Sequence, residues 1–221
     1  GVSSVILLMS LGNSAREEAA NQIRGIGSNL IFVNITDREG SLPNDWLENI
    51  QEAALIKNYS QLVSSQVSYT IEGQSVDVSV SGVNDKYASI NSLDMTTGRF
   101  LNSYDLAYDS PVVVLGSKIP GLLLPNQEVI GSTLMIKGMP FTVVGVAEER
   151  GTNFSGDNDL MVYVPMRFAS RMSGFNTRNK TFYIEAASEE TVDLTLSRVL
   201  GYLETIMPSE NSYRAFSQTQ I

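Results

Sequence analysis

Apolar and polar positions alternate in the first third of the chain in a pattern that predicts a strand, a helix and a second strand. The stretch 28–35 reads as a strand, and 58–71 reads as the strand that returns after the helix. Between them, Pro43 and Asn44 open a predicted helix over 41–55. The apolar stripe of this predicted helix is formed by Trp46, Leu47, Ile50 and Ala54.

The same order of elements returns near the end of the chain. A predicted strand over 180–187 is followed by a predicted helix over 188–208, with Ser188 as its N-cap and Pro208 at its end. The stretch 211–217 reads as the returning strand. Two βαβ-like units of this kind are expected to form one antiparallel sheet with helices on one face, which is an α+β layer. The apolar stripe of the second helix is formed by Val192, Leu196, Val199, Leu203 and Ile206.

The middle of the chain has a different pattern, with short strands and frequent turn residues. Strict alternation over 76–83 predicts a half-buried hairpin strand, and 111–116 is a continuous apolar strand. A hairpin over 132–149 is expected to turn at Lys137-Gly138, and 159–165 is a further strand. These elements indicate a compact β-rich domain. Short helices are expected over 84–92, 117–124 and 166–172.

The first 28 residues differ from both patterns. Residues 1–12 are apolar on nearly every face, and 13–25 are amphipathic at best. This gradient is typical of a helix that leaves a bilayer, but a helix whose first turns are buried by the rest of the protein would show the same gradient. No cationic segment or cleavage site brackets the stretch, so it does not read as a signal peptide. No apolar run in the chain approaches the ~20 residues of a membrane span.

Two glycine-rich stretches have the spacing of phosphate-binding loops. Gly25 and Gly27 follow a helical pattern and precede a strand, which reverses the order that a dinucleotide loop needs. Gly116–Gly121 has the glycine spacing of a Walker A loop, but Leu122 and Leu123 stand where the lysine and hydroxyl are required. We therefore interpret the first pair as helix C-terminal residues and the second stretch as a strand-to-helix turn.

Composition excludes several kinds of chemistry. The chain of 221 residues contains no cysteine and no histidine, which removes disulfides, thiol nucleophiles, the commonest general base and the commonest metal ligand. Its net charge of −9 argues against a nucleic-acid partner, because phosphates require clustered Lys and Arg. No cofactor or metal site is predicted.

The acidic residues suggest a site only weakly. Asp157–Asp159 could offer oxygen ligands to calcium, but an EF-hand needs a glutamate at position 168, where Phe168 stands. A polar turn ahead of a buried strand is the simpler interpretation. Glu148-Glu149 would point to opposite faces of a strand, and Glu189-Glu190 suit the first turn of a helix. A serine nucleophile would need a lysine as its base, and no lysine is placed near a serine by the sequence.

Four stretches of the chain carry a family resemblance through their order and spacing. They are "GVSSVILLMSLGNSAREEAANQIRGIGSNLIFV", "GVNDKYASINSLDMTTGRF", "PVVVLGSKIPGLLLPNQEVIGSTLMIKGMPFTVVGV" and "DNDLMVYVPMRFASRM". Together they resemble the extracytoplasmic domain of MacB-type ABC transporter permeases. That resemblance implies an N-terminal stalk helix that continues from a transmembrane helix, a porter subdomain of βαβ units, and an inserted β-rich subdomain called Sabre.

The resemblance and the periodicity together predict the domain boundaries. We expect the stalk at 1–28, the first half of the porter subdomain at 29–83, the Sabre-like insertion at 84–176, and the second half of the porter subdomain at 177–221, leading to the next transmembrane helix.

The family resemblance also implies a role. The domain would be non-catalytic and would lie on the periplasmic or extracellular side of the cell membrane. It would couple cytoplasmic ATP hydrolysis to export of antibiotics, peptides or similar substrates. The implied partners are a second permease protomer, a cytoplasmic ATP-binding domain or subunit, and a periplasmic adaptor protein in two-membrane bacteria.

The stalk is the part expected to transmit force. Val5, Met9 and Ile23 would pack against the returning stalk or the second protomer, so that a swing of the helix moves both subdomains. The alternative is that these three side chains simply cap the core of the porter subdomain.

Two other functions fit the same architecture. Lipoprotein-releasing permeases share the two-subdomain plan. A secreted or surface-anchored module could instead capture a ligand in the crevice between its subdomains. A soluble enzyme would need a site that the histidine-free sequence does not offer.

Overall fold

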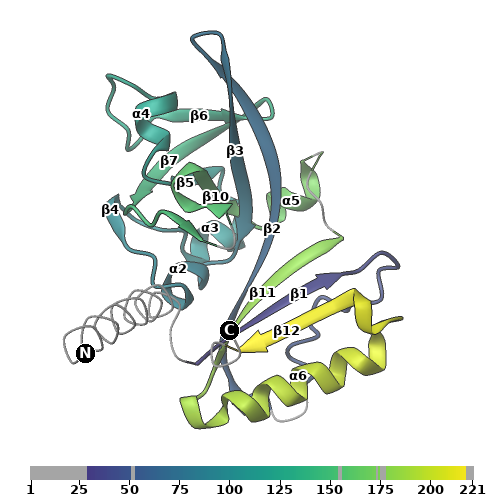
Figure 1. Cartoon of the computed structure of the whole chain (residues 1–221). Helices are drawn as coiled ribbons and strands as arrows, with labels where there is room; N and C mark the ends of the chain where they lie inside the picture. Colours follow the sequence, from purple (N-terminus) through teal and green to yellow (C-terminus); the bar gives the residue numbers. More distant parts are fainter. Residues whose placement is uncertain (1–28, 51–52, 154–155, 173, 175–177, 218–221) are drawn as a thin grey trace, which may run out of the picture.

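The computed structural model describes residues 29–50, 53–153, 156–172, 174 and 178–217. Its main sheet has ten strands in the order β12-β1-β11-β2-β3-β10-β5-β7-β4, with β6 paired to β7. A lower lobe contains β12, β1, β11 and the start of β2, and an upper lobe contains the remaining strands (Figure 1). The strands of the sheet are β1 (Leu30–Thr36), β2 (Ile56–Ile71), β3 (Gln74–Val83), β4 (Met95–Gly98), β5 (Val112–Leu115), β6 (Thr133–Ile136), β7 (Met139–Ala147), β10 (Met161–Pro165), β11 (Asn179–Ala186) and β12 (Tyr213–Ser217).

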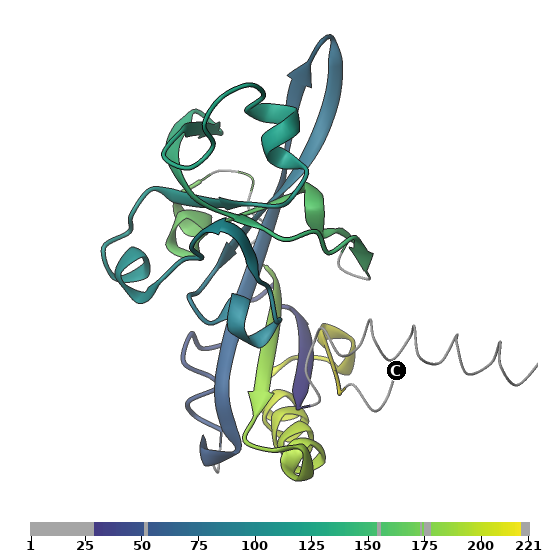
Figure 2. The same cartoon turned by 90° about the vertical axis from the view of Figure 1, so that its left-hand side faces the viewer.

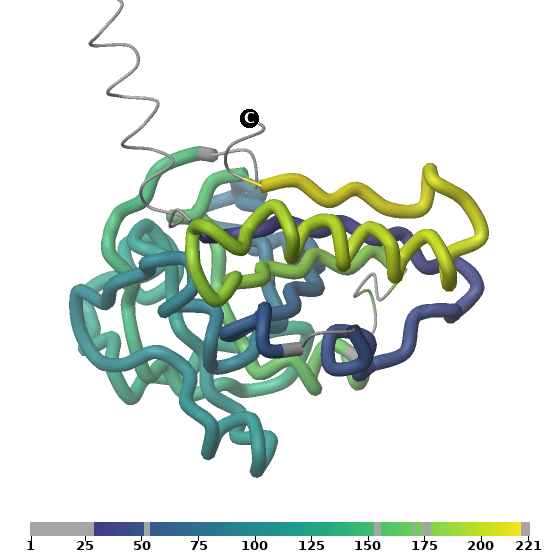
Figure 3. The backbone as a smooth tube through the Cα atoms, turned by 90° about the horizontal axis from the view of Figure 1, so that it is seen from below, coloured from purple at the N-terminus to yellow at the C-terminus, as the bar shows by residue number. Residues whose placement is uncertain are grey.

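Two pairs of strands, β1 with β2 and β11 with β12, interlock in the lower lobe. Strands β1 and β2 both pair antiparallel with β11, which lies between them, while β11 and β12 both pair antiparallel with β1. Helix α6 (Val192–Ile206) connects β11 to β12 and covers one face of these strands, as the view from below shows (Figure 3). The short 3-10 helix η3 (Glu189–Thr191) precedes it, and Ser188 forms a capping box with Thr191. The predicted α+β layer and its second helix are confirmed.

The prediction of a helix over 41–55 is wrong. The chain makes consecutive turns over 44–49 and a single 3-10 turn, η1 (Ala53–Leu55). The Asp37 carboxylate accepts the backbone N–H groups of Ser41 at 2.8 Å and Leu42 at 3.0 Å, so the segment is anchored from its start.

Burial rather than helical hydrogen bonding sets the path of this segment. Trp46 is 1% exposed, and its ring lies 5.1 Å from that of Phe182 and 6.1 Å from that of Tyr202. Leu47 and Ile50 are buried as the stripe predicted, whereas Ala54 is exposed. Turns bring both Trp46 and Leu47 into the core although they are adjacent in sequence.

The β2–β3 hairpin joins the two lobes. The first part of β2 pairs with β11 up to Leu62, and from Leu62 onward β2 pairs with β3. Glu72 and Gly73 both have positive φ, as a two-residue hairpin turn of type I′ requires. Strand β2 runs most of the height of the molecule, and the tip of the hairpin extends past the upper lobe (Figure 2). One continuous strand therefore belongs to both lobes.

The upper lobe confirms the strands and hairpin predicted for the middle of the chain. Strand β10 pairs parallel with β3 and antiparallel with β5, and β5 pairs parallel with β7. The β6–β7 hairpin turns at Lys137-Gly138, both with positive φ. The sequence did not indicate β4, the helix α3 (Ser103–Ala107), or the small β8 (Thr152–Asn153) and β9 (Gly156–Asp157) pair. The predicted short helices are present as α2 (Tyr87–Ile90), α4 (Ile119–Leu123) and α5 (Arg167–Arg171).

Alternation along the strands sorts the buried side chains into three clusters. In the lower lobe, Ile31 and Val33 of β1 face α6. In the upper lobe, Val78 and Val80 of β3 face a second cluster with α4 and α5. The opposite face of the same sheet carries a third cluster, which draws on both lobes. Its buried members are Leu30, Phe32, Val83, Tyr87, Ile90, Leu93, Leu101, Val114, Ala147, Met161, Tyr163 and Tyr183.

The close approach of β7 to the chain after β4 depends on Gly145. A Cβ atom at this position would overlap the carbonyl oxygen of Arg99. We expect Gly145→Ala to lower the free energy of unfolding by about 2–3 kcal/mol through overpacking, as measured by urea denaturation. Gly121→Ala is the matched control, because a Cβ on Gly121 meets nothing within 4 Å. Equal stability of the two variants would contradict the packing described here.

Candidate functional site at the junction of the lobes

The residues expected to form the stalk contact lie outside the described part of the chain. Val5, Met9 and Ile23 all fall within 1–28, as do Gly25 and Gly27, so their roles stay predictions. Within the described ranges, no helix is both long and apolar enough to cross a membrane.

The Walker-like stretch is a strand-to-helix turn, as predicted. The N–H of Gly116 donates to the carbonyl oxygen of Met161 at 2.7 Å, and α4 begins at Ile119. A Cβ on Gly116 would lie 2.7 Å from three backbone carbonyl oxygens. The glycine therefore permits close backbone contact, and its amide is already used within the fold.

The Asp157–Asp159 turn precedes β10, and its carboxylates accept backbone hydrogen bonds within the fold. The buried Asp159 carboxylate accepts the backbone N–H groups of Arg150 at 2.8 Å and Gly151 at 2.9 Å. Burial by itself would raise the pKa of Asp159, but these hydrogen bonds, with help from Ser117 and Lys118, outweigh burial and lower that pKa below its ordinary value. Among the residues the structure describes, no group of three acidic side chains could hold a metal ion.

The paired acidic residues do not converge on a common point. Glu148 and Glu149 follow the end of β7 rather than lying within it, and both are exposed. Glu189 and Glu190 lie in the 3-10 turn before α6 and are exposed too. Neither pair has the enclosed surroundings that acid–base chemistry requires.

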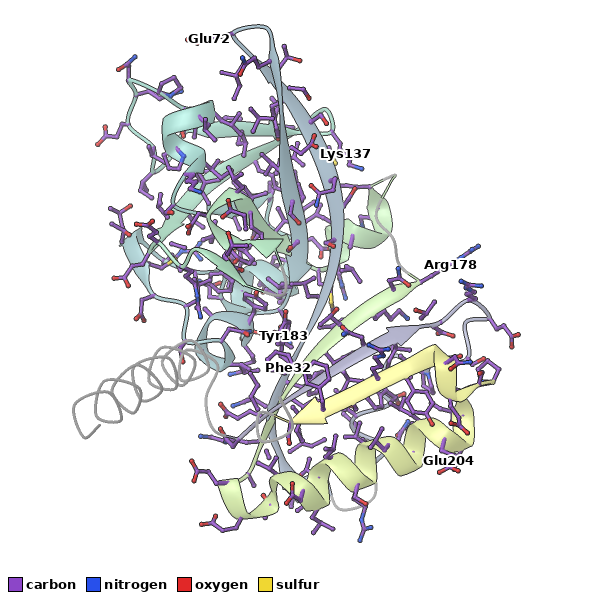
Figure 4. The ribbon with its side chains drawn as sticks, in the orientation of Figure 1. Phe32, Glu72, Lys137, Arg178, Tyr183 and Glu204 are labelled. Carbon is purple, nitrogen blue, oxygen red and sulfur yellow. The ribbon has the colours of Figure 1, made fainter. Side chains whose placement is uncertain are left out.

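One lysine does lie beside a serine, which the sequence did not indicate. The Lys137 Nζ donates a hydrogen bond of 3.0 Å to the Ser65 Oγ. Lys137 is in the β6–β7 turn and extends toward β2 in the upper lobe (Figure 4). Ser65 lies within the paired part of β2, opposite Val80 of β3. The contact ties a hairpin turn to the strand behind it.

The structural feature that couples the lobes is a set of packed aromatic rings. Phe32 of β1 lies 5.4 Å from Tyr183 of β11, and Tyr183 lies 5.4 Å from Tyr87 of α2, both pairs edge to face. Tyr87 in turn lies 5.2 Å from Tyr163 of β10 and 6.2 Å from Phe100. We call these five residues the junction cluster. Figure 4 shows Phe32 and Tyr183 side by side where the lower lobe meets the upper one.

The junction cluster contains three buried tyrosines, and burial shifts the pKa of two of them, Tyr87 and Tyr163. Burial raises the pKa of Tyr163 to about 12 and raises that of Tyr87 well above its ordinary value. A hydrogen bond links the two side chains and raises the pKa of Tyr87 further. Both phenols therefore stay neutral, and neither is a candidate base near neutral pH.

A signal for the junction was present in the sequence. In 30–35 and 182–186, the residues that would point to one face of a strand and those that would point to the other are both mainly apolar. This indicates strands that are buried on both faces. The partner ring Tyr87 comes from a four-residue helix, and nothing in its local sequence marks it as a contact of β1 or β11.

A cavity of about 230 Å³ opens beside the junction cluster on the same face of the sheet. Phe32 and Tyr183 form one wall, and Ser64, Ser79 and Ser81 of β2 and β3 form another. The serine side chains give this part of the sheet face a small, polar lining. It lies on the side of the sheet opposite α6, because Phe32 and Ile31 point to opposite faces.

Comparison with protein families gives a match over most of the chain. The model of the MacB-like periplasmic core domain matches residues 1–201. The macrolide export ATP-binding/permease protein MacB of Rhodospirillum rubrum is 29% identical over 185 residues, which are 79% of this chain and 28% of that protein. MacB of Azoarcus sp. is 29% identical over 210 residues, which are 90% of this chain and 32% of that protein. The chain thus spans about a third of the length of these relatives.

Solved structures share the fold. The crystal structure of the periplasmic region of MacB from Actinobacillus actinomycetemcomitans superimposes with a TM-score of 0.68 at 18% identity, covering 90% of this chain and 92% of that one. The extracellular domain of the noncanonic ABC-type transporter YknZ from Gram-positive bacteria gives a TM-score of 0.63 at 16% identity, covering 86% and 100%.

The buried phenols make the fold sensitive to alkali. In the unfolded chain Tyr163 loses its proton near pH 10, whereas the folded state holds it until about pH 12. The stabilisation, about 3 kcal/mol for this shift, is complete below pH 10 and is lost as the pH rises toward 12. We expect the unfolding free energy of Tyr163→Phe to fall less steeply with pH between 10 and 12, by up to one proton per molecule, or about 1.4 kcal/mol per pH unit. Urea denaturation at a series of pH values measures this slope. Tyr104→Phe removes a phenol hydroxyl from a residue that is 63% exposed, and it is the control for the substitution itself.

Proposed function

The chain belongs to the family of MacB-like periplasmic core domains, and from this premise we propose that it is the extracytoplasmic domain of a MacB-type ABC transporter permease. In this role it is non-catalytic. It couples ATP hydrolysis in the cytoplasm to export of antibiotics, peptides or similar substrates by moving as a unit. The permease holds it on the outer side of the cell membrane.

The observation that supports coupling is the continuity of the two lobes. Strand β2 pairs with β11 in the lower lobe and with β3 in the upper lobe. The junction cluster then fills the angle between them with rings from β1, β11, α2 and β10. A close-packed interior transmits displacement rather than absorbing it. A force applied to the lower lobe would therefore move the upper lobe with it.

The proposal assigns parts of the chain to mechanical roles. Residues 1–28 form the stalk, with Val5, Met9 and Ile23 as its packing side chains. Residues 29–83 and 177–221 form the porter subdomain, and 84–176 form the Sabre-like insertion. The β2–β3 hairpin is the element that the two share, since Val63, Val78 and Val80 pack in the upper cluster.

The partners follow from the same proposal. A second permease protomer would face the domain in a dimer, and an ATP-binding domain or subunit would lie across the membrane. A periplasmic adaptor would contact the outward side in hosts with two membranes. The exposed side chains Tyr104 and Tyr108 of the upper lobe are 63% and 70% exposed and offer the kind of aromatic surface that protein partners use.

The proposal predicts what surrounds the chain in its natural reading frame. We expect an apolar helix of ~20 residues continuing into Gly1 and at least one more after Ile221. Sequencing the gene for ~40 codons on each side tests this. A cleavable signal before Gly1 with only polar sequence after Ile221 would favour a secreted binding module instead.

The coupling role predicts different effects for two similar substitutions in the full-length transporter. Phe32 and Phe182 are each 3% exposed, but Phe32 packs in the junction cluster and Phe182 packs against Trp46 in the lower lobe. Each change to leucine should cost a similar stability, about 1 kcal/mol. We expect Phe32→Leu to lower the substrate-stimulated ATPase rate several-fold while the basal rate is kept.

The matched control is Phe182→Leu, which should leave both rates near the starting values. The measurement is ATP hydrolysis by the transporter in liposomes with and without substrate, at equal amounts of inserted protein. If both variants lose stimulation equally, or if neither does, the junction is not the coupling element.

A further inference from the structure

The cavity beside the junction cluster has the lining of a binding site. It is lined by residues that β1, β11, β2, β3 and β10 present on the same face of the sheet. The register places Ser64 of β2 directly opposite Ser81 of β3, and Ser79 lies two residues along β3 on the same face. Across the cavity, Asn34 pairs with Thr181, and the Thr181 hydroxyl donates to the Asn34 Oδ1 at 3.0 Å.

The lining combines aromatic walls with hydroxyl and amide groups. Phe32 and Tyr183 supply ring surface, and Leu62 and Met161 extend the apolar part. Of the described residues that line the cavity, none carries a charge. The chain as a whole has a net charge of −9, and the lining of the cavity contributes none of it. A charged ligand would lose its hydration here without gaining an ion pair.

One polar group in the lining lacks a partner. The Ser81 residue is 0% exposed, and among the described residues its Oγ has no hydrogen-bond partner. Leaving a buried hydroxyl unsatisfied costs about 1–3 kcal/mol, and buried polar side chains are satisfied in the large majority of cases. Because Ser81 lines the cavity, a group bound there could supply the missing hydrogen bond.

We propose that this cavity binds a neutral amphipathic small molecule, with its apolar body against Phe32 and Tyr183 and a hydroxyl or amide group at Ser81. The volume, about 230 Å³, admits a small ligand or one end of a larger one. The Asn34–Thr181 pair at the other side provides a second polar contact, which fixes the ligand's direction. This site does not depend on the transport role, since binding requires only the folded chain.

Binding can be tested on the chain of 221 residues with three probes of equal tail length. Hexyl glucoside is neutral, hexyl sulfate is an anion and hexyltrimethylammonium is a cation. Each is titrated below its micelle concentration while amide and methyl NMR signals are followed. We expect saturable shifts at residues of β1, β2, β3 and β11 with hexyl glucoside, and weaker, non-saturable changes with both ions.

A matched pair of serine variants tests the role of the hydroxyl. Ser60 and Ser81 lie on adjacent strands, are both 0% exposed and both have a hydroxyl without a partner among the described residues, but only Ser81 lines the cavity. Ser81→Ala should weaken hexyl glucoside binding about three- to tenfold, which is the value of one hydrogen bond. Ser60→Ala should leave the affinity unchanged. Ser79→Leu fills the cavity and should abolish binding.

Folding is checked independently of binding. The single tryptophan, Trp46, is buried on the other face of the sheet, so its fluorescence reports the lower lobe without contact to the ligand. The proposal is overturned if hexyl glucoside gives no saturable shifts, which would mean that only water enters the cavity. It is also overturned if the ions bind as tightly as the glucoside, or if folded Ser81→Ala binds as the unchanged chain does.

Discussion

The contact of Phe32, Tyr183 and Tyr87 at the junction is the constraint on which the rest of the structure depends. Strand β1 is buried on both faces, with Ile31 and Val33 toward α6 and Phe32 toward the upper lobe. Because alternation fixes which side chains share a face, a shift of one residue in register would move Phe32 toward α6 and break both contacts at once. The packing of Ile31 and Val33 against α6 and the ring packing on the opposite face of the sheet therefore specify the same register.

Local sequence patterns were sufficient to predict those elements that have their own capping residues and a regular apolar stripe. The helix after Ser188 has a cap, acidic residues in its first turn and a regular apolar stripe, and the structure contains it. The stripe at Trp46 was similar, yet the segment folds as turns because the Asp37 carboxylate anchors its start and the indole ring packs between two aromatic rings. A periodic stripe indicates which side chains are buried, but tertiary packing decides how the backbone delivers them.

The cavity could not have been predicted from the same patterns, because its lining residues come from distant strands. Ser81 reads in the sequence as one polar position of an alternating strand, and only pairing with β2 and β10 encloses its hydroxyl. The contact of Lys137 with Ser65 joins residues 72 positions apart and likewise has no local signal. Conversely, the exclusion of a Walker loop at Gly116 needed only the two leucines that follow it.

The interlocked order of strands in the lower lobe also governs when that lobe can form. Asn29 donates to the carbonyl oxygen of Ala186, and these residues are 157 positions apart. Strand β1 therefore has no neighbour to pair with until most of the chain has been synthesised, whereas β5, β6 and β7 lie close together in sequence and can pair early. Closing so long a loop is slow, and it leaves an apolar strand exposed in the meantime. During biogenesis the upper lobe would fold first, and β1, β11 and β12 would then be assembled together against it.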